Sequence, residues 1–442
     1  MSLSDAILLA NEAPKPFDWN RLGEHLPVEW VEAALMEQGK ASIRHRRLPA
    51  QQVVWLVIAL ALYRHRSVAQ VLAELDLALP NDAAPFVTDG AATKARSRLG
   101  FEPVEWLFRK SAKAWSDQDK ESYLFNGLVL LAMDGTSLRT PDSVANRAHF
   151  GAQRYAKGTV ASYPQVRAAT LTHVPTHLVV DARFGPYAMT EKAFAMELVE
   201  SIADDSLTVV DKGFLAAELL CRLTSNGRNR HFLIPAKSNT KWVVIDGGPD
   251  DAIVEMKVSA QARAKAPELP KKWRARAIAA IDEKGDKHFL LTSLTDRIAF
   301  KAEDLIACYG RRWHIETSYH ELKQTMMGMA LTLRSQTVAG VQQEIWGAMI
   351  AYNLVRLEMA KAALEAGCAP TDISFVRAFH TIQYELIWAA ATRAYGTLPK
   401  LLQNMRQRLV TELTVKRPGR KFDRVVKTTP QRYPFRKTKI LA

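Results

Sequence analysis

Two aspartates and one glutamate are the residues of this chain best suited to chemistry. Asp134 and Asp211 each come directly after a short apolar run, LVLLAM and LTVV respectively, and these runs predict buried strands. Because α/β sheets place their reactive groups at strand ends, both acids are candidate catalytic residues. Each aspartate alone also has an ordinary interpretation as a turn residue.

The third acid, Glu316, lies in a segment with the period of a helix. At about 100° per residue, apolar residues of the segment 305–327 form one buried stripe. Beside it, within an arc of roughly 60°, lie Tyr309, Arg312, Glu316 and Lys323. Such an edge would run for roughly 20 Å and follow a phosphate backbone. The alternative is a solvated helix face tied by an i,i+4 ion pair.

The three acids are most informative together. If the two predicted strands are neighbours and the helix packs across them, Asp134, Asp211 and Glu316 converge, and their mutual repulsion requires cations. Oxygen ligands favour Mg²⁺ or Mn²⁺ over zinc. Two such ions can activate a water or a 3′ hydroxyl and stabilise the leaving oxygen of a phosphoryl transfer. The sequence contains no HExxH, no paired-cysteine motif and no Gly-rich phosphate loop that would indicate a different chemistry.

The charge of the chain indicates a polyanionic partner, since the formal net charge is +14 and the pI is near 9.6. Ten Lys or Arg residues against the single Asp423 lie between Lys416 and Lys439, so nine of the fourteen net charges belong to this segment. Its prolines and its lack of apolar periodicity predict an extended or disordered basic arm that contacts nucleic acid. A merely solubilising tail is the alternative.

The remaining composition points to the cytoplasm. The longest apolar run, residues 53–63, is too short to cross a bilayer, and the first residues lack a basic leader and a small-residue cleavage site. Three widely spaced cysteines give neither a disulfide framework nor a zinc site, and we expect core positions for Cys221, Cys308 and Cys368.

The pattern of apolar residues divides the chain of 442 residues into six parts. Residues 1–122 predict an all-helical N-terminal domain, whose basic residues either contact DNA phosphates or solubilise the helices: Arg44, Arg46, Arg47, Lys94, Arg96 and Arg98. The following parts are a first part of an α/β core, a β-rich insertion, a last part of the core with the charged helix, C-terminal helices and the basic arm: 123–236, 237–298, 299–330, 331–415 and 416–442.

The spacing of the charged edge resembles a known signature. Tyr309-x2-Arg312-x3-Glu316-x6-Lys323 matches the Y-R-E-K motif of the DDE transposases of the insertion sequence 4 family, and Asp134-Gly135-Thr136 and Asp211-x-Gly213-Phe214 precede it in the order of that family. The resemblance covers nearly the whole chain. It implies an α/β fold with a ribonuclease-H-like catalytic core and a β-rich insertion, preceded by a helical DNA-binding domain and followed by helices and a basic tail.

The resemblance also implies roles for single residues. Asp134, Asp211 and Glu316 would bind two Mg²⁺ ions, for which Mn²⁺ can substitute. Tyr309, Arg312 and Lys323 would hold phosphates of the cleaved transposon end.

The family's reaction is cut-and-paste transposition. Water nicks one strand, the released 3′ hydroxyl attacks the other strand to give a hairpin, and the hairpin is reopened before insertion into target DNA. A homodimer bridges the two inverted-repeat ends. In a relative, an aromatic residue of the insertion stacks a flipped base. Trp242, Trp273 and Trp313 are candidates here, although we expect each of them in the core. His314 and His320 fall away from the charged edge and are expected at the surface.

Two other functions fit the same residues. A ribonuclease-H-like nuclease would use the acids and metals to cut DNA without strand transfer, but it would not need the phosphate-binding residues around Glu316. A non-catalytic DNA-binding protein would be expected to lack at least one of the three acids, and all three are present.

Overall fold

The computed structural model describes residues 25–41, 48–75, 77, 87–118, 120–155, 159–282, 285–327, 332–392 and 405–410. The predicted basic arm, 416–442, and the arginines at 44, 46 and 47 lie outside these residues. The chain forms two compact units. The first comprises 1–111, 322–330 and 337–420, and the second comprises 112–321, 331–336 and 421–442.

The first unit is helical in its described part. Its elements, with α6 continuing into the second unit, are α2 (Val28–Glu37), α3 (Ala50–Leu62), α4 (Val68–Glu74), α5 (Asp89–Leu99), α6 (Glu102–Asp117), α13 (Val338–Ala366), η7 (Pro370–Asp372) and α14 (Phe375–Thr392).

Local residues account for two helix boundaries of this unit. Ser67 caps α4 with a capping box, and Gly100 ends α5 with φ of 76°. Helix α3 packs against α13, where Gly347 allows the close approach, since a Cβ there would lie 2.6 Å from Val57 Cγ1.

The second unit is built on one mixed sheet of nine strands in the order β3-β2-β1-β4-β5-β9-β8-β7-β6. The strands are β1 (Val129–Arg139), β2 (Gln165–His173), β3 (Val179–Pro186), β4 (Ser206–Val210), β5 (Arg230–Pro235), β6 (Val243–Gly247), β7 (Asp251–Lys257), β8 (Lys272–Ile281) and β9 (Lys287–Thr292).

The strand directions divide this sheet. Strands β1, β4 and β5 are parallel neighbours, whereas β2 and β3 run antiparallel beside β1. All pairings from β5 through β9 to β6 are antiparallel. The segment predicted as a β-rich insertion contains β6 to β9 and the short helix α10 (Ala260–Lys265), and its strands extend the same sheet.

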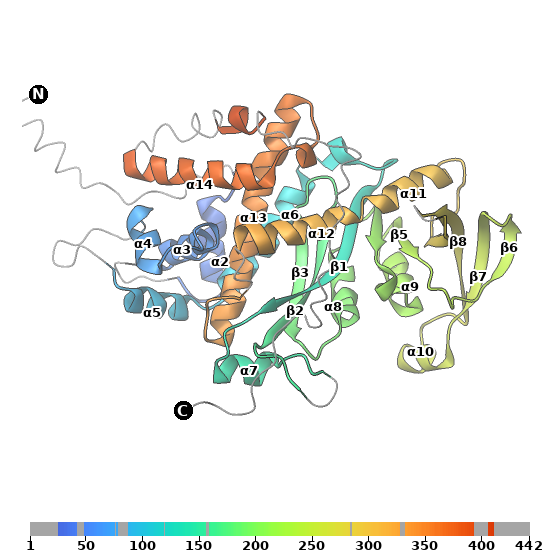
Figure 1. Ribbon diagram of the computed structural model, residues 1–442, viewed down its shortest axis with the longest axis horizontal. Helices are drawn as coiled ribbons and strands as arrows, with labels where there is room; N and C mark the ends of the chain where they lie inside the picture. The colour runs from blue at the N-terminus through green and yellow to red at the C-terminus, as the bar shows by residue number, and fades with distance from the viewer. Residues whose placement is uncertain are drawn as a thin grey trace, which may run out of the picture. The chain divides into compact units, whose positions relative to one another are not determined.

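Helices cover both faces of the sheet around β1 (Figure 1). On one face, Leu131 and Met133 join a core with Phe194 of α8 (Glu191–Leu198) and with residues of α9 (Ala217–Ser225). On the other face, Leu130 packs in a core with Ile315. This alternation follows the two-residue period of a strand, so consecutive residues of β1 face different helices.

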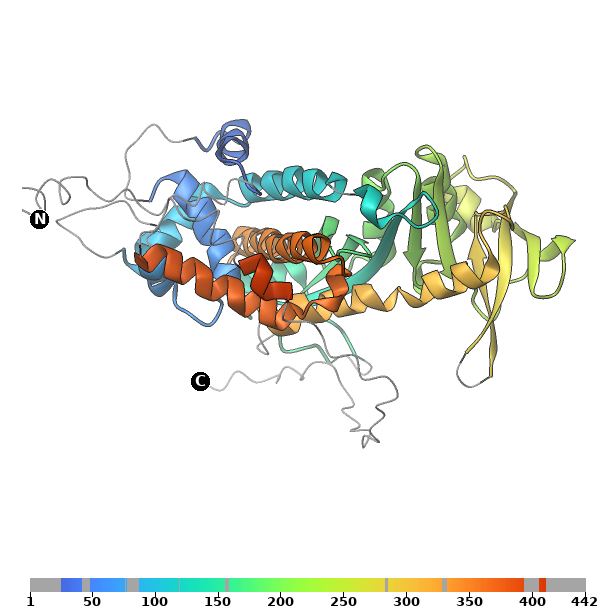
Figure 2. The ribbon, with the colours of Figure 1, turned by 90° about the horizontal axis from the view of Figure 1, so that it is seen from above.

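The charged segment is not the single regular helix that its sequence predicts. Helix α11 (Ala302–Gly310) ends in a tight turn, where the N–H of Arg311 bonds to Cys308 O and that of Arg312 to Tyr309 O. Helix α12 (Trp313–His320) follows, and η6 (Glu321–Met326) has wider π-helical turns. Figure 2 shows this chain of helices in gold along the sheet. Even so, the predicted apolar stripe is buried in all three pieces, at Cys308, Ile315, Leu322 and Met326.

The other helices of the second unit are short. They are α7 (Val144–Phe150), η2 (Lys120–Tyr123), η4 (Val199–Ser201), η5 (Lys212–Phe214) and α10 (Ala260–Lys265). Within the described ranges, no helix of either unit combines the length and apolar character needed to span a bilayer.

Candidate active site

Asp134 and Asp211 follow the last paired residues of two parallel strands. The ladder between β1 and β4 ends with Met133 opposite Val210, so each aspartate is the next residue on its own chain. After Val210 the strand stops, because Asp211 accepts a hydrogen bond from the N–H of Gly213 at 3.2 Å and caps η5. The prediction of strand-end acids is thus right for Asp211.

For Asp134 the same prediction is wrong in one respect. Strand β1 continues to Arg139, because its ladder with β2 runs on from Asp134 opposite Thr170 to Arg139 opposite Gln165. What ends at Asp134 is only the pairing with β4. The carboxylate therefore lies where the two parallel strands part.

The surroundings of Asp134 disfavour its charge. Burial raises the pKa of this carboxyl to about 6, against a lowering by its hydrogen bond from Gly135 N–H and by Arg312. The charges of Asp211 and Glu191 raise the pKa further. A second anion near Asp134 thus comes from the neighbouring strand, as the sequence predicts, and a third comes from the start of α8.

Arg312 links two of the predicted acids. Its Nη2 donates to Glu316 Oε1 at 2.7 Å, and its Nη1 lies 4.0 Å from Asp134 Oδ2. The i,i+4 pair foreseen as the alternative interpretation is therefore present. However, only 13% of the Arg312 side chain is exposed, against 40% of the Glu316 side chain, so the guanidinium itself is not on a solvated helix face.

Tyr309 completes this group at the end of α11. Burial raises the pKa of its phenol to about 12, while the hydrogen-bonded and charged Arg312 lowers it and the nearby Asp211 and Asp134 raise it. At neutral pH the phenol is therefore protonated. It can donate a hydrogen bond to an anionic oxygen, but it is a poor nucleophile.

Carboxylate oxygens alone make a donor set that suits a hard divalent cation. Nevertheless, no three His, Cys, Asp or Glu side chains in the described part of the chain are arranged to hold a metal ion. Glu316 is instead engaged by the guanidinium of Arg312, which supplies the positive charge that Asp134 and Glu316 need in one place. The residues fit a cation, and their role as metal ligands stays a prediction.

Lys323 is the sixth residue of the predicted site. It is half-buried on η6 and belongs to the first unit, whereas the other five belong to the second. Its role as a phosphate ligand remains a prediction.

Comparisons with known proteins decide the family. Residues 16–109 match the model of the insertion element 4 transposase N-terminal region, and residues 126–354 match that of the transposase DDE domain. Transposase InsG for insertion sequence element IS4 of Escherichia coli (strain K12) is 36% identical over 415 residues, which are 93% of each chain. The chain belongs to the DDE transposases of the insertion sequence 4 family.

Two further comparisons are weaker. The putative transposase InsZ of the same strain is 35% identical over 229 residues, which are 51% of this transposase and 74% of that protein. A cryo-EM structure of a piggyBac transposase synaptic complex with hairpin DNA has a TM-score of 0.42 at 12% identity, over 93% of this transposase and 86% of that chain, which is too distant to bear on the function. Family membership makes the chain an enzyme that acts on DNA with divalent metal ions.

Two residues of the transposase that lie near Asp134 were not predicted from the sequence. The buried Tyr319 donates to the carbonyl oxygen of Asp134 at 2.6 Å and bonds to Thr170 Oγ1 at 2.8 Å. The sequence feature that could have identified Tyr319 is its position four residues after Ile315, on the buried face of α12. For Glu191, the sequence predicted only that a helix starts there, and nothing indicated its position near Asp134.

Two predictions about flanking residues of α12 are wrong. His314 is not a free surface residue, because its Nδ1 lies 2.9 Å from Nε2 of the buried His177, in the turn between β2 and β3. Trp313 is not in the core, since 64% of it is exposed. The contact of His314 comes from the turn after β2, which the helix period does not include, and the exposure of Trp313 agrees with a position beside the charged edge on the predicted wheel. His320 is exposed, as predicted.

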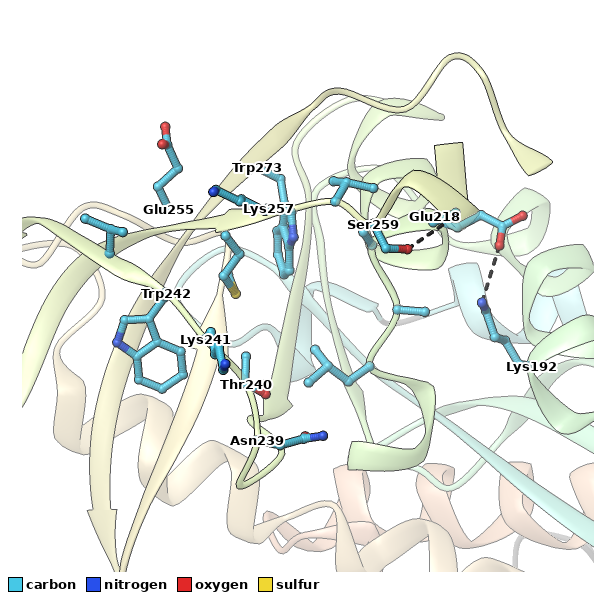
Figure 3. Close-up of a pocket in the computed structure, with 17 residues that line it drawn as sticks. Lys192, Glu218, Asn239, Thr240, Lys241, Trp242, Glu255, Lys257, Ser259 and Trp273 are labelled. Atoms are coloured by element: carbon cyan, nitrogen blue, oxygen red, sulfur yellow. Dashed lines mark hydrogen bonds and ion pairs between the residues drawn. The ribbon is translucent and has the colours of Figure 1, made fainter. Parts of the chain in front are cut away.

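The other two tryptophans considered for base stacking, Trp242 and Trp273, line a hollow of about 700 Å³ in this transposase. Trp242 packs on Phe289, and Trp273 packs on Phe232. Figure 3 shows both rings facing the space in which Lys241 also lies. Each ring is only half-buried, so the expectation of full burial in the core is met by neither.

Proposed function

We propose that this transposase moves its element by cut-and-paste, with a hairpin intermediate, in the cytoplasm and as a homodimer that bridges both inverted-repeat ends. The catalytic core is proposed to be ribonuclease-H-like. In support, β3-β2-β1-β4-β5 has two antiparallel strands beside three parallel ones, with Asp134 and Asp211 where β1 and β4 part. That juxtaposition, with Arg312 joining Asp134 to Glu316, is the observation on which the proposal depends.

Asp134, Asp211 and Glu316 are proposed to hold two Mg²⁺ or Mn²⁺ ions. When bound, such ions make a water or a 3′ hydroxyl more nucleophilic and stabilise the leaving oxygen of the phosphodiester. In support, Asp211 and Glu191 lie near enough to Asp134 to raise its pKa, and burial disfavours the charge of Asp134 when no cation is bound.

We propose that Arg312 binds carboxylates in the protein alone and a DNA phosphate during the reaction. In the protein alone it neutralises Glu316 and approaches Asp134. If the carboxylates held divalent ions, the guanidinium of Arg312 would be free to direct its planar donors to a phosphate of the cleaved end. Tyr309 would donate a hydrogen bond from its phenol to the same phosphate, since the raised pKa keeps the phenol protonated. Lys323 would add a third positive or hydrogen-bonding contact.

The hairpin step requires a base to leave the stack at the transposon end. The hollow beside Trp242 and Trp273 offers aromatic faces on which such a base can stack. Trp273 takes part in two hydrophobic clusters and Trp242 in one, so we assign the stacking to Trp242. A Trp242→Ala variant should nick normally and accumulate nicked ends without hairpins; normal hairpin yield would refute the assignment.

The competing proposal is a nuclease that cuts without joining. An assay with a labelled duplex of the element's inverted repeat and a target plasmid separates the two. Nicked, hairpin and joined products are expected in Mg²⁺ or Mn²⁺. Cleavage without joined product at every concentration of either ion would leave the nuclease as the better description.

The metal-binding role of Glu316 has a matched control. Glu316→Gln should abolish nicking while DNA binding stays intact or becomes tighter, because a carboxylate facing phosphates is removed. Glu303→Gln changes an exposed glutamate at the start of α11 and should nick like the wild type. Equal nicking by both variants would exclude the role of Glu316.

A further inference from the structure

A second hollow of the catalytic unit is lined by arginine. It measures about 720 Å³ and is bordered by Arg147, Arg154, Gly151, Ala152, Val160, Arg167, Tyr187 and Ala188. No carboxylate is among these lining residues. A concave surface with several guanidinium groups and no acid attracts anions.

Two of the arginines are held in place by the fold. Arg167 lies with its guanidinium carbon 4.2 Å from the centre of the Tyr187 ring, and its Nη1 donates to Met189 O at 3.0 Å. Arg147 donates to Asp142 and to Ser162 O. Because these contacts use only part of each guanidinium, the remaining N–H groups are fixed in direction and available to a ligand.

The positive charge of the hollow is largely uncompensated. The carboxylate of Asp142 offsets the charge of Arg147. Among the described residues, neither Arg154 nor Arg167 has a carboxylate at ion-pair distance, and Arg154 is exposed. Two full positive charges in one hollow therefore face solvent together with a polarised aromatic ring.

The hollow is lined by α7, by β2 and by the segments that follow α7 and β3. In the ladder between β1 and β2, Arg167 lies opposite Ser137, three residues beyond Asp134. Because side chains alternate along a strand, Arg167 is on the face of the sheet opposite to the Asp134 side chain, at a position roughly 10 Å farther along β1. Beyond Met133, β1 has no partner in β4, so this end of the strand is not enclosed by the parallel part of the sheet. Figure 1 shows β1 leading from the sheet toward α7, the helix that contributes Arg147.

We propose that this hollow is a DNA subsite that binds backbone phosphates outside the active centre. The proposal rests on the proposed function for its substrate, but not for its chemistry. Paired N–H groups of a guanidinium match two oxygens of a phosphodiester, and Tyr187 holds one guanidinium in the orientation that presents them. The strand bound there belongs either to the transposon end or to the target duplex.

The test measures equilibrium binding, so it does not depend on catalysis. The Glu316→Gln protein is titrated separately with a cleaved transposon-end duplex and with an unrelated target duplex, over a range of salt concentrations. Arg154→Gln, Arg167→Gln and the double variant are compared with Arg228→Gln. Arg228 is an exposed arginine of the same unit, paired with Asp205, and serves as the control.

Each lost phosphate contact should reduce the salt slope of log Kd by about 0.9 and weaken binding several-fold. A reduced slope with the end duplex alone assigns the hollow to the transposon end, and a reduced slope with the target alone assigns it to the target. Slopes equal to that of Arg228→Gln with both duplexes would overturn the subsite. Arg154→Gln alone decides the matter if the changes at position 167 lower the unfolding temperature, because Arg154 is exposed. Loss of nicking by Glu316→Gln is a separate result that leaves this one intact.

Discussion

The carboxylate of Glu191 lies where a side chain at position 135 would begin. A Cβ built on Gly135 would be 2.2 Å from Glu191 Cδ and 2.4 Å from Oε2. Gly135 lies inside β1 and has no positive φ, so its lack of a side chain serves space and not backbone conformation. The glycine thus lets an acid from α8 approach the strand beside Asp134.

Gly135→Ala should therefore push the carboxylate of Glu191 away. Because the displaced atoms belong to one flexible side chain, the free energy of unfolding should fall by about 1 kcal/mol or less, and we expect nicking to fall several-fold because the charge of Glu191 moves away from Asp134. Urea unfolding and a nicking assay measure the two effects. Gly90→Ala, with nothing within 4 Å of the added Cβ, is the control and should not destabilise the protein. A Gly135→Ala variant as stable and as active as the wild type would contradict the steric role.

The stability of the metal-free protein should depend on pH through Asp134. Its folded pKa of about 6 lies above the ordinary value of 3.8, so the folded state binds this proton more readily than the unfolded state. The resulting stabilisation is full below about pH 4 and is lost as the pH rises through about 6. Asp134→Asn removes the penalty and should be more stable than the wild type by up to about 3 kcal/mol at pH 7.5, and by little at pH 4.

Urea unfolding in EDTA at both pH values checks this expectation. Asp304→Asn, which changes an exposed acid in the first turn of α11, should show no such dependence. A difference between Asp134→Asn and the wild type that is the same at pH 4 and pH 7.5 would mean that the buried charge is not its cause.

Removal of the Arg312 side chain should impair the reaction late. Because we assign its guanidinium to a phosphate of an end already cut, Arg312→Ala should make the first nick and then stall before hairpin formation or joining. Time courses on a denaturing gel with an end-labelled duplex resolve these steps. Arg311→Ala changes the exposed neighbouring arginine and should complete the sequence. If Arg312→Ala lost the first nick while pre-nicked DNA was still processed, the assignment would be wrong.

Deletion of the basic arm, residues 416–442, should weaken DNA binding and flatten its salt dependence. The arm carries ten Lys or Arg residues between Lys416 and Lys439, and each cation that neutralises a phosphate contributes to the salt slope. Fluorescence anisotropy at several salt concentrations gives the slope. An unchanged slope for the truncated protein would show that the arm only solubilises the chain.

Much of the fold follows from local patterns. Apolar runs predict β1 and β4, and the acids that follow them, because a buried strand needs little more than continuous apolar residues. Alternation and turn residues likewise predict the strands of the insertion, and Gly367 predicts the end of α13, where it adopts the left-handed conformation.

Other features depend on contacts between distant residues and could not be predicted. The continuation of β1 past Asp134 is due to its partner β2, and the approach of Glu191 to Gly135 is due to the packing of α8. The contact of His314 with His177, in the turn after β2, also joins distant residues, so the period of the helix could not predict it. Local sequence propensity does not specify which distant segments pair or pack together, because these contacts depend on the assembled sheet.

The pairing of β5 with β9 has a consequence for engineering this enzyme. Without the strands that continue the sheet from β9 to β6, β5 and its apolar residues Phe232 and Ile234 would present an open row of amide and carbonyl groups. Unprotected rows of this kind recruit strands from other molecules and promote aggregation. A minimal catalytic core made by cutting out residues 237–298 is therefore expected to precipitate unless the exposed border of β5 is redesigned with charges or proline.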